Sequence, residues 1–175
     1  MAEVFDLLDK NRIPTGEKIL RGSHFSEGQY HQVVHICIFN QAGQMLIQQR
    51  QPFKEGWPGF WDITLGGSVI EGEDACAGAH RELMEELGID YDFTDVRPQL
   101  TVNFEHGFDD YFILAMELDP AGLRFQPEEV QAARWAEREE IHEMIDRGVF
   151  IPYWHELIDL LFASRFHWGA HQPHN

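Results

Sequence analysis

The stretch from Gly67 to Ile89 constrains this chain most, because it gathers Glu82, Glu85 and Glu86 within one predicted helix. In a helix that begins near Asp74, residues three and four apart share a face, so the three carboxylates would form a cluster. Like charges at these spacings repel by roughly 0.2–0.5 kcal/mol per pair, and acids in a last turn oppose the helix dipole. A bound divalent cation would replace this repulsion by attraction between each carboxylate and the ion, and oxygen ligands suit Mg²⁺ or Mn²⁺. The stretch therefore predicts a metal site.

The flanks of the cluster indicate how it is held. Apolar residues at helical spacing should pack this helix on a sheet and point the carboxylates away from the core; they are Ala75, Ala79, Leu83 and Leu87. Gly88 suits a left-handed cap at the end of the helix. Residues 60–66 read as a strand leading into Gly66 and Gly67, where the lack of side chains would let a backbone carbonyl approach an ion closely. The predicted site thus lies on a strand, a loop and a helix.

Composition narrows the class of partner. A chain of 175 residues with 43% hydrophobic and 25% charged residues fits one globular domain. Thirteen basic against thirty acidic residues give a net charge of −17, which disfavours nucleic acid and anionic membranes as partners. No apolar run approaches the ~20 residues of a membrane span, and the N-terminus lacks the pattern of a signal peptide. We therefore expect a cytoplasmic protein that binds small molecules, with Cys37 and Cys76 as reduced core thiols.

Strand and turn patterns alternate with helical ones along the chain. Strands are predicted at 4–8, 18–22, 30–39, 44–50, 60–66, 96–104, 110–118 and 130–136, and further helices at 137–147 and 153–166. Mixed strands with helices on either side indicate an α/β fold, an α/β/α sandwich around a mixed β-sheet. Residues 1–28 would be an N-terminal extension packed on a domain of residues 29–166, and 167–175 a C-terminal tail. The stripe of Leu157, Leu160 and Leu161 would pack in the core or cover a homodimer interface.

The spacing of the acidic stretch resembles the Nudix box at every specified position. Gly67 is followed after five residues by Glu73 and after seven more by Arg81, and Gly88 closes the pattern. An ordinary solvated acidic helix would explain the glutamates, but not these four residues at their offsets. The resemblance implies a Nudix fold and hydrolysis of a diphosphate bond in compounds that join a nucleoside diphosphate to another group.

The same resemblance implies roles for individual residues. Glu85 and Glu86 would be metal ligands, Glu82 would bind metal or help to deprotonate the water, and the carbonyl of Gly66 or Gly67 would complete the ligand shell. Arg81 would hold Glu73 or a box carboxylate in place. Some members recruit a further acid from outside the box, for which the candidates here are Glu128, Glu129, Asp109 and Asp110. Arg50 and Lys54 would hold the diphosphate of the substrate.

Residues 24–61 also look like isopentenyl-diphosphate isomerase, a branch of the same fold. The likeness includes His24 and His31, seven apart as two metal ligands are in that family, and Trp57-Pro58-Gly59-x-Trp61. The departures fall on the chemistry, because Gly66 replaces the isomerase cysteine, Ser68 a ligating histidine and Glu82 a phosphate-binding arginine. We therefore expect His24 and His31 to have a structural or substrate-contact role.

Three functions follow from these patterns. The leading hypothesis is a metal-dependent Nudix hydrolase that cleaves the diphosphate bond of a small, nucleotide-type substrate. The alternatives are isopentenyl-diphosphate delta-isomerase activity and a non-catalytic, ligand-sensing Nudix domain. Gly66 argues against the isomerase, and the full set of carboxylates argues against a sensor.

Overall fold

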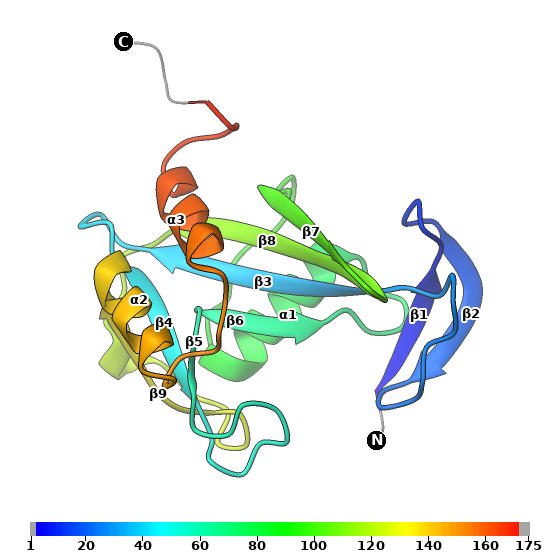
Figure 1. The fold of residues 1–175 in the computed structure, drawn as a ribbon, viewed down its shortest axis with the longest axis horizontal. Coiled ribbons are helices and arrows are strands. Elements are labelled where there is room, and N and C mark those ends of the chain that lie inside the picture. Colours follow the sequence, from blue (N-terminus) through cyan, green and yellow to red (C-terminus); the bar gives the residue numbers. More distant parts are fainter. Residues whose placement is uncertain (1–2, 172–175) are drawn as a thin grey trace.

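The computed structural model describes residues 3–171, and residues 172–175 of the predicted tail lie outside that range. A two-stranded hairpin stands beside a mixed seven-stranded sheet that carries helices on both faces (Figure 1). The strands are β1 (Val4–Leu8), β2 (Pro14–Leu20), β3 (His31–Phe39), β4 (Met45–Arg50), β5 (Trp61–Asp62), β6 (Leu65–Ser68), β7 (Leu100–Phe104), β8 (Gly107–Ala115) and β9 (Val130–Ala136). The helices are α1 (Ala75–Leu87), the 3-10 helix η1 (Pro120–Gly122), α2 (Arg138–Asp146) and α3 (His155–Ser164). The predicted α/β/α sandwich with a mixed sheet is confirmed.

Strand β3 divides the hydrophobic core into two layers because its side chains alternate between the faces of the sheet. Val34, Ile36 and Ile38 pack towards α1 in one cluster of buried residues. Cys37 and Phe39 point the other way and pack with α2 and α3. Both cysteines are free thiols, as predicted, and the buried one lies in this second layer.

The sheet opens beside β3, and this opening positions the site. β3 runs parallel to β8 and antiparallel to β6. It meets β4 only at the pair Phe39 and Met45, while β4 continues with β9 and β5 as its partners. Strands β6 and β5 therefore lie on separate branches of the sheet, with α1 behind the gap between them.

Four predicted elements need correction. The strand expected at 60–66 is two short strands, because the Thr64 hydroxyl accepts from the Ile38 N–H at 2.9 Å and donates to the Leu46 carbonyl, replacing regular ladder bonds. β2 begins at Pro14 instead of residue 18, after a turn in which Arg12 has φ 66°. β7 begins at Leu100 instead of residue 96, and β8 begins at residue 107 instead of 110 because the preceding turn is shorter.

The hairpin β1–β2 rests on the loop that leads into α1. The Glu71 N–H donates to the Val4 carbonyl at 2.8 Å, and the Gly72 N–H donates to Asp6 Oδ2 at 2.7 Å. An ion pair between Lys18 and Glu71 adds a third contact. The hairpin is therefore fixed to the segment that presents the acidic helix.

Helix α3 buries a different stripe from the predicted one. Ile158, Leu161 and Phe162 are buried, Leu157 is partly buried, and Leu160 is 43% exposed. The one-residue shift arises because α3 begins at His155 and packs its buried face on α2 and β3. The homodimer stays a prediction. Among the described residues, no helix has the length and apolar character needed to cross a bilayer.

Candidate active site

Helix α1 is held at both ends by the residues that the sequence singled out. Asp74 caps the start by accepting a hydrogen bond from the Ala77 N–H at 2.8 Å. Gly88 ends the helix with φ 68°, a left-handed conformation that costs glycine little. Leu83 and Leu87 are fully buried against the sheet, and the adjoining face of the helix, which carries Glu82 and Glu86, lines the cavity described below.

One of the three box carboxylates is buried and a second is largely covered, which corrects the expectation that they all point away from the core. Glu86 is only 6% exposed, and its nearest donor is Gln48 Nε2 at 3.3 Å. Burial, with the charges of Glu82 and Glu129, raises the pKa of Glu86 to about 8. Burial also raises the pKa of Glu82, whose side chain is 13% exposed. Only Glu85, with 54% of its side chain exposed, stands in solvent.

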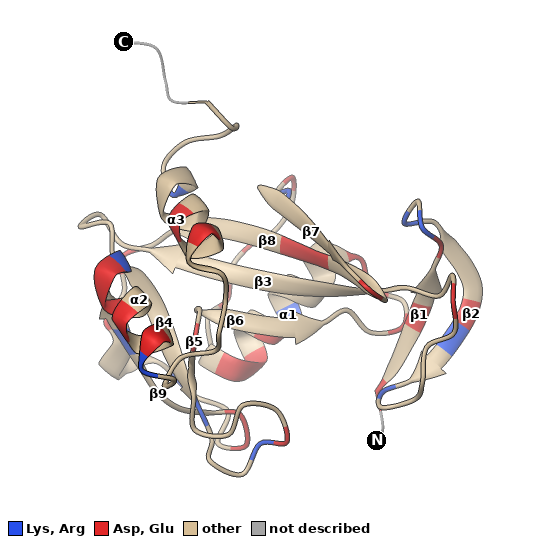
Figure 2. Cartoon of the chain, in the orientation of Figure 1, with Lys and Arg blue, Asp and Glu red and all other residues tan. Residues whose placement is uncertain are grey.

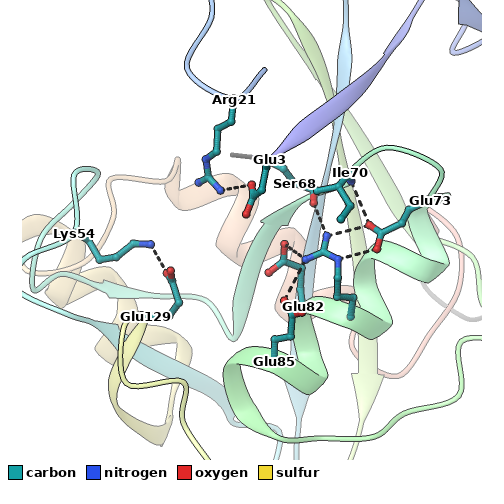
Figure 3. A network of polar contacts seen from close by, with 10 residues as sticks. Glu3, Arg21, Lys54, Ser68, Ile70, Glu73, Glu82, Glu85 and Glu129 are labelled. Carbon is teal, nitrogen blue, oxygen red and sulfur yellow. Dashed lines mark hydrogen bonds and ion pairs between the residues drawn. The ribbon is translucent and has the colours of Figure 1, made fainter. Parts of the chain in front are cut away.

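Arg81 organises this cluster, as predicted. Its Nε and Nη2 donate to both carboxylate oxygens of Glu73, at 2.7 and 3.0 Å, and Nη2 also donates to the Ser68 carbonyl at 2.9 Å. Nη1 donates to Glu82 at 2.9 Å and to Glu85 at 3.4 Å (Figure 3). The bond to Glu73 is the main cause that raises the pKa of Arg81. The guanidinium therefore ties the box loop to the face of α1 that carries the carboxylates.

Gly66 and Gly67 are needed for space. A Cβ on Gly67 would stand 2.2 Å from Glu82 Cδ, so any side chain there would displace the buried carboxylate. A Cβ on Gly66 would stand 3.0 Å from His35 Nδ1 on the other face of the strand. The isomerase cysteine would therefore meet the His35 ring at this position.

Gly66, Gly67, Arg81 and the three box carboxylates line one cavity of about 330 Å³. Its walls come from the hairpin, β3, the loop between β4 and β5, β6, α1 and the segment before β9. In Figure 2 the acidic positions of α1 lie across from the basic positions at the end of β4 and in the loop that follows it. The residues that the sequence analysis had named and that line the cavity are Arg50, Lys54, Trp57, Gly66, Gly67, Ser68, Arg81, Glu82, Glu85, Glu86 and Glu129.

The wall opposite α1 is cationic and aromatic. Lys54 forms an ion pair with Glu129, and Arg50 Nε donates to the Gly56 carbonyl at 3.0 Å. Trp57 is 47% exposed and has φ 52°, which turns the loop back at the cavity edge. This arrangement offers two positive side chains and an indole ring to an anionic ligand.

Three predicted substrate residues, His24, His31 and Asp110, do not line the described cavity. His24 is exposed, and His31 stacks between Phe5 and Phe25 at ring distances of 5.2 and 4.9 Å. Burial lowers the pKa of His31, in keeping with a packed, neutral ring. The two histidines do not line the described cavity.

Asp110 is fully buried at a distance from the box. Its carboxylate pairs with Arg12 of the hairpin and accepts from the Thr101 hydroxyl and the Gln32 amide. These partners satisfy both carboxylate oxygens, and Asp110 does not line the described cavity. The geometry gives it a structural role in tying the hairpin to the sheet.

Sequence reasoning missed six polar residues that line the cavity: Glu3, Arg21, His35, Asp62, Gln126 and Tyr153. His35 Nε2 lies 3.1 Å from Asp109 Oδ1, and the Tyr153 hydroxyl donates to Asp62 Oδ1 at 2.8 Å. Burial raises the pKa of Asp62. His35 interrupts the apolar run of β3, which is a signal that the sequence carried. Tyr153 reaches the site from 91 residues beyond Asp62, and no local pattern reveals that contact.

The donor set fits a hard divalent cation. Buried carboxylates that face one another without a neighbouring ammonium are costly, and oxygen ligands are those that Mg²⁺ and Mn²⁺ prefer. Within residues 3–171 no three acidic, histidine or cysteine side chains already stand in a closed ligand arrangement. Glu82 and Glu85 instead share the Arg81 guanidinium. Binding of a cation would require these two side chains to turn by rotation about their side-chain bonds.

Comparison with known proteins agrees with this geometry. The NUDIX domain family model matches residues 29–153. An uncharacterized Nudix hydrolase of Listeria monocytogenes is 42% identical over 167 residues, covering 94% of this chain and 99% of that protein. An isopentenyl-diphosphate delta-isomerase of Streptomyces coelicolor is 30% identical, covering 90% and 83% of the two chains. The crystal structure of DR0079 from Deinococcus radiodurans shares the fold, with a TM-score of 0.72, 24% identity and coverage of 91% and 97%.

Proposed function

Because this chain belongs to the Nudix hydrolase family, we propose that its cavity hydrolyses the diphosphate bond of a small, nucleotide-type substrate with Mg²⁺ or Mn²⁺. The observation that carries the proposal is the convergence of Glu82, Glu85 and Glu86 in a cavity whose facing wall holds Arg50 and Lys54. Carboxylates on one side and cations on the other match a substrate that arrives as a metal diphosphate.

Each wall has a separate task in this proposal. Glu82, Glu85 and Glu86 would hold the metal, with a backbone carbonyl of Gly66 or Gly67 as a further ligand. A bound ion would neutralise the negative charge of the diphosphate and lower the pKa of water. Side chains of the protein would position the carboxylates, accept the proton from water and bind the diphosphate.

Arg81 keeps the box carboxylates in register through its bonds to Glu73, Glu82 and Glu85. Glu82, nearly buried and hydrogen-bonded to Arg81, is positioned to accept a proton from the attacking water. Arg50 would contact the diphosphate, since its guanidinium has Nη groups left over after its Nε bond to Gly56. Lys54 can exchange Glu129 for a phosphate oxygen.

The local geometry supports hydrolysis over isomerisation. A double-bond shift needs an acid at one carbon and a base at another, and Gly66 provides no thiol for the first step. Cys37 lies fully buried in the other layer of the core, and burial raises the pKa of its thiol. The three carboxylates, in contrast, match the requirements of metal-assisted attack by water.

The test is a panel of diphosphate compounds, with Mg²⁺ and with chelator, assayed for pyrophosphate or phosphate and for phosphate that an added phosphatase releases from the phosphomonoester products. The panel includes nucleoside triphosphates, nucleotide sugars, ADP-ribose, dinucleotides and isopentenyl diphosphate, with the last also followed for its isomer. Turnover of one compound that chelator abolishes would support the hydrolase. Isomer formation without phosphate release would refute it, and so would binding of a panel member without turnover, which is the behaviour of a sensor.

A further inference from the structure

The N-terminal hairpin brings an ion pair to the cavity from outside the region that the family model matches. Glu3 precedes β1 and Arg21 follows β2, whereas the matched domain begins at residue 29. Both residues line the cavity, and Arg21 Nη1 donates to Glu3 Oε2 at 2.5 Å. The Arg21 N–H also donates to the Glu3 carbonyl at 2.9 Å, so the backbone holds the two residues together.

This pair faces the box carboxylates. Figure 3 shows Arg21 and Glu3 reaching down from the hairpin towards Glu82, with Lys54 and Glu129 on another side of the same space. Glu3, Arg21 and Glu82 all line this one cavity. The hairpin contacts with the loop before α1 fix where the pair stands.

Arg21 has bonding capacity left for a ligand. Its side chain is 59% exposed, and within the described part of the chain its guanidinium has Glu3 as its only partner. A guanidinium offers five N–H donors in a planar fork that matches two phosphate oxygens. Arg81, by comparison, is occupied by Glu73, Glu82 and Ser68.

We propose that Arg21 binds a phosphate oxygen of the diphosphate substrate and that Glu3 holds its guanidinium in position. This inference rests on the proposed function and extends the site beyond the matched domain. Arg21 approaches from the hairpin, while Arg50 and Lys54 approach from the loop between β4 and β5. The diphosphate is thereby contacted from two sides of the carboxylate cluster.

Binding of imidodiphosphate with Mg²⁺ to the full chain tests this inference by calorimetry, without any need for turnover. Arg21→Ala should weaken binding about tenfold, the size of one charge-assisted hydrogen bond at an exposed position, and Arg21→Lys should weaken it less. Lys18→Ala is the matched control, because it removes a positive charge and an ion pair from the same hairpin outside the cavity. The control should bind within about twofold of the wild type.

Glu3→Gln separates positioning from net charge. Removing a negative charge alone would tighten the binding of an anion, whereas loss of the partner that positions Arg21 should weaken it about threefold. Unchanged binding by Arg21→Ala overturns the proposal, as does equal weakening by Lys18→Ala. Tighter binding by Glu3→Gln overturns the positioning role of Glu3.

Steady-state kinetics with a substrate that the protein hydrolyses give a second test of the role of Arg21. Arg21→Ala should raise KM about tenfold and leave kcat within about twofold, since Arg21 holds the substrate and does not touch the metal. A panel without turnover would refute the hydrolase, while the calorimetry would still decide the role of Arg21.

Discussion

Replacing Glu86 by Gln should stabilise the metal-free protein at neutral pH while it removes a proposed metal ligand. Glu86 is 6% exposed, and its carboxylate faces Glu82 and Glu129. Burial, followed by these two charges, raises its pKa from an ordinary 4.5 to about 8. Glutamine keeps the shape of the side chain and the contact with Gln48, but carries no charge to desolvate.

The sign and size follow from proton linkage. A carboxyl group whose pKa is raised by folding binds its proton more tightly in the folded chain, so its stabilising contribution is present below pH 4.5 and is lost as pH rises towards 8. Each unit of this window costs about 1.4 kcal/mol, which gives about 3 kcal/mol at pH 7. The free energy of unfolding of Glu86→Gln should exceed that of the wild type by about that amount, which corresponds to roughly 6–12 °C in Tm.

Denaturant unfolding with chelator, at intervals from pH 4.5 to pH 8, measures this difference. The gain should vanish near pH 4.5 and grow towards pH 8, while the exposed neighbour Glu85→Gln should stay within about 0.5 kcal/mol of the wild type. Saturating Mg²⁺ should stabilise the wild type and not Glu86→Gln. A difference independent of pH, or a loss of stability at pH 8, would show that Glu86 is not a strained buried acid.

Three further substitutions test other parts of the site. Glu85→Gln should lower kcat by about 100-fold or more on the substrate that the panel identifies, and near wild-type turnover would mean that the box is not the metal site. Gly67→Ala places a Cβ 2.2 Å from Glu82 Cδ, so Mg²⁺ affinity by calorimetry should fall at least about tenfold while circular dichroism stays unchanged. Tyr153→Phe removes the 2.8 Å bond to buried Asp62 and should cost about 1–3 kcal/mol in denaturant unfolding at pH 8. That cost should shrink at pH 5, because losing the donor raises the already raised pKa of Asp62 and only the charged form is penalised.

Local patterns predicted the parts of this protein that local physics determines. The start of the helix near Asp74, the left-handed Gly88 and the spacing of Arg81 from Glu73 are all set within one helix and its loop. The β-branched and aromatic residues along 30–39 likewise predicted a strand, and the structure shows it buried on both faces. These features need no knowledge of the rest of the chain.

The missed residues depend on contacts that the sequence does not encode locally. Arg21 and Tyr153 reach the cavity only because the hairpin docks on the box loop and the segment before α3 crosses the open branch of the sheet. For His31 the structure favours the structural alternative of the prediction, since tertiary packing places its ring between two phenylalanines. The burial of Glu86 was not predicted because helical periodicity shows which face of a helix is apolar, but not how deep in a cavity a side chain lies.

Position 66, where the resemblance places the isomerase cysteine, leaves little space for a side chain. A Cβ on Gly66 would stand 3.0 Å from His35 Nδ1, and His35 cannot move freely because it contacts Asp109 at 3.1 Å and stacks on Tyr111 at 4.5 Å. Residues 35 and 66 are therefore coupled. Gly66→Ala should cost about 1–3 kcal/mol in the wild type and much less in a His35→Ala background, as measured by a double-mutant cycle of unfolding free energies. Additive costs would show that the ring yields without strain, and that a side chain at 66 is excluded by the chemistry of the site instead of by space.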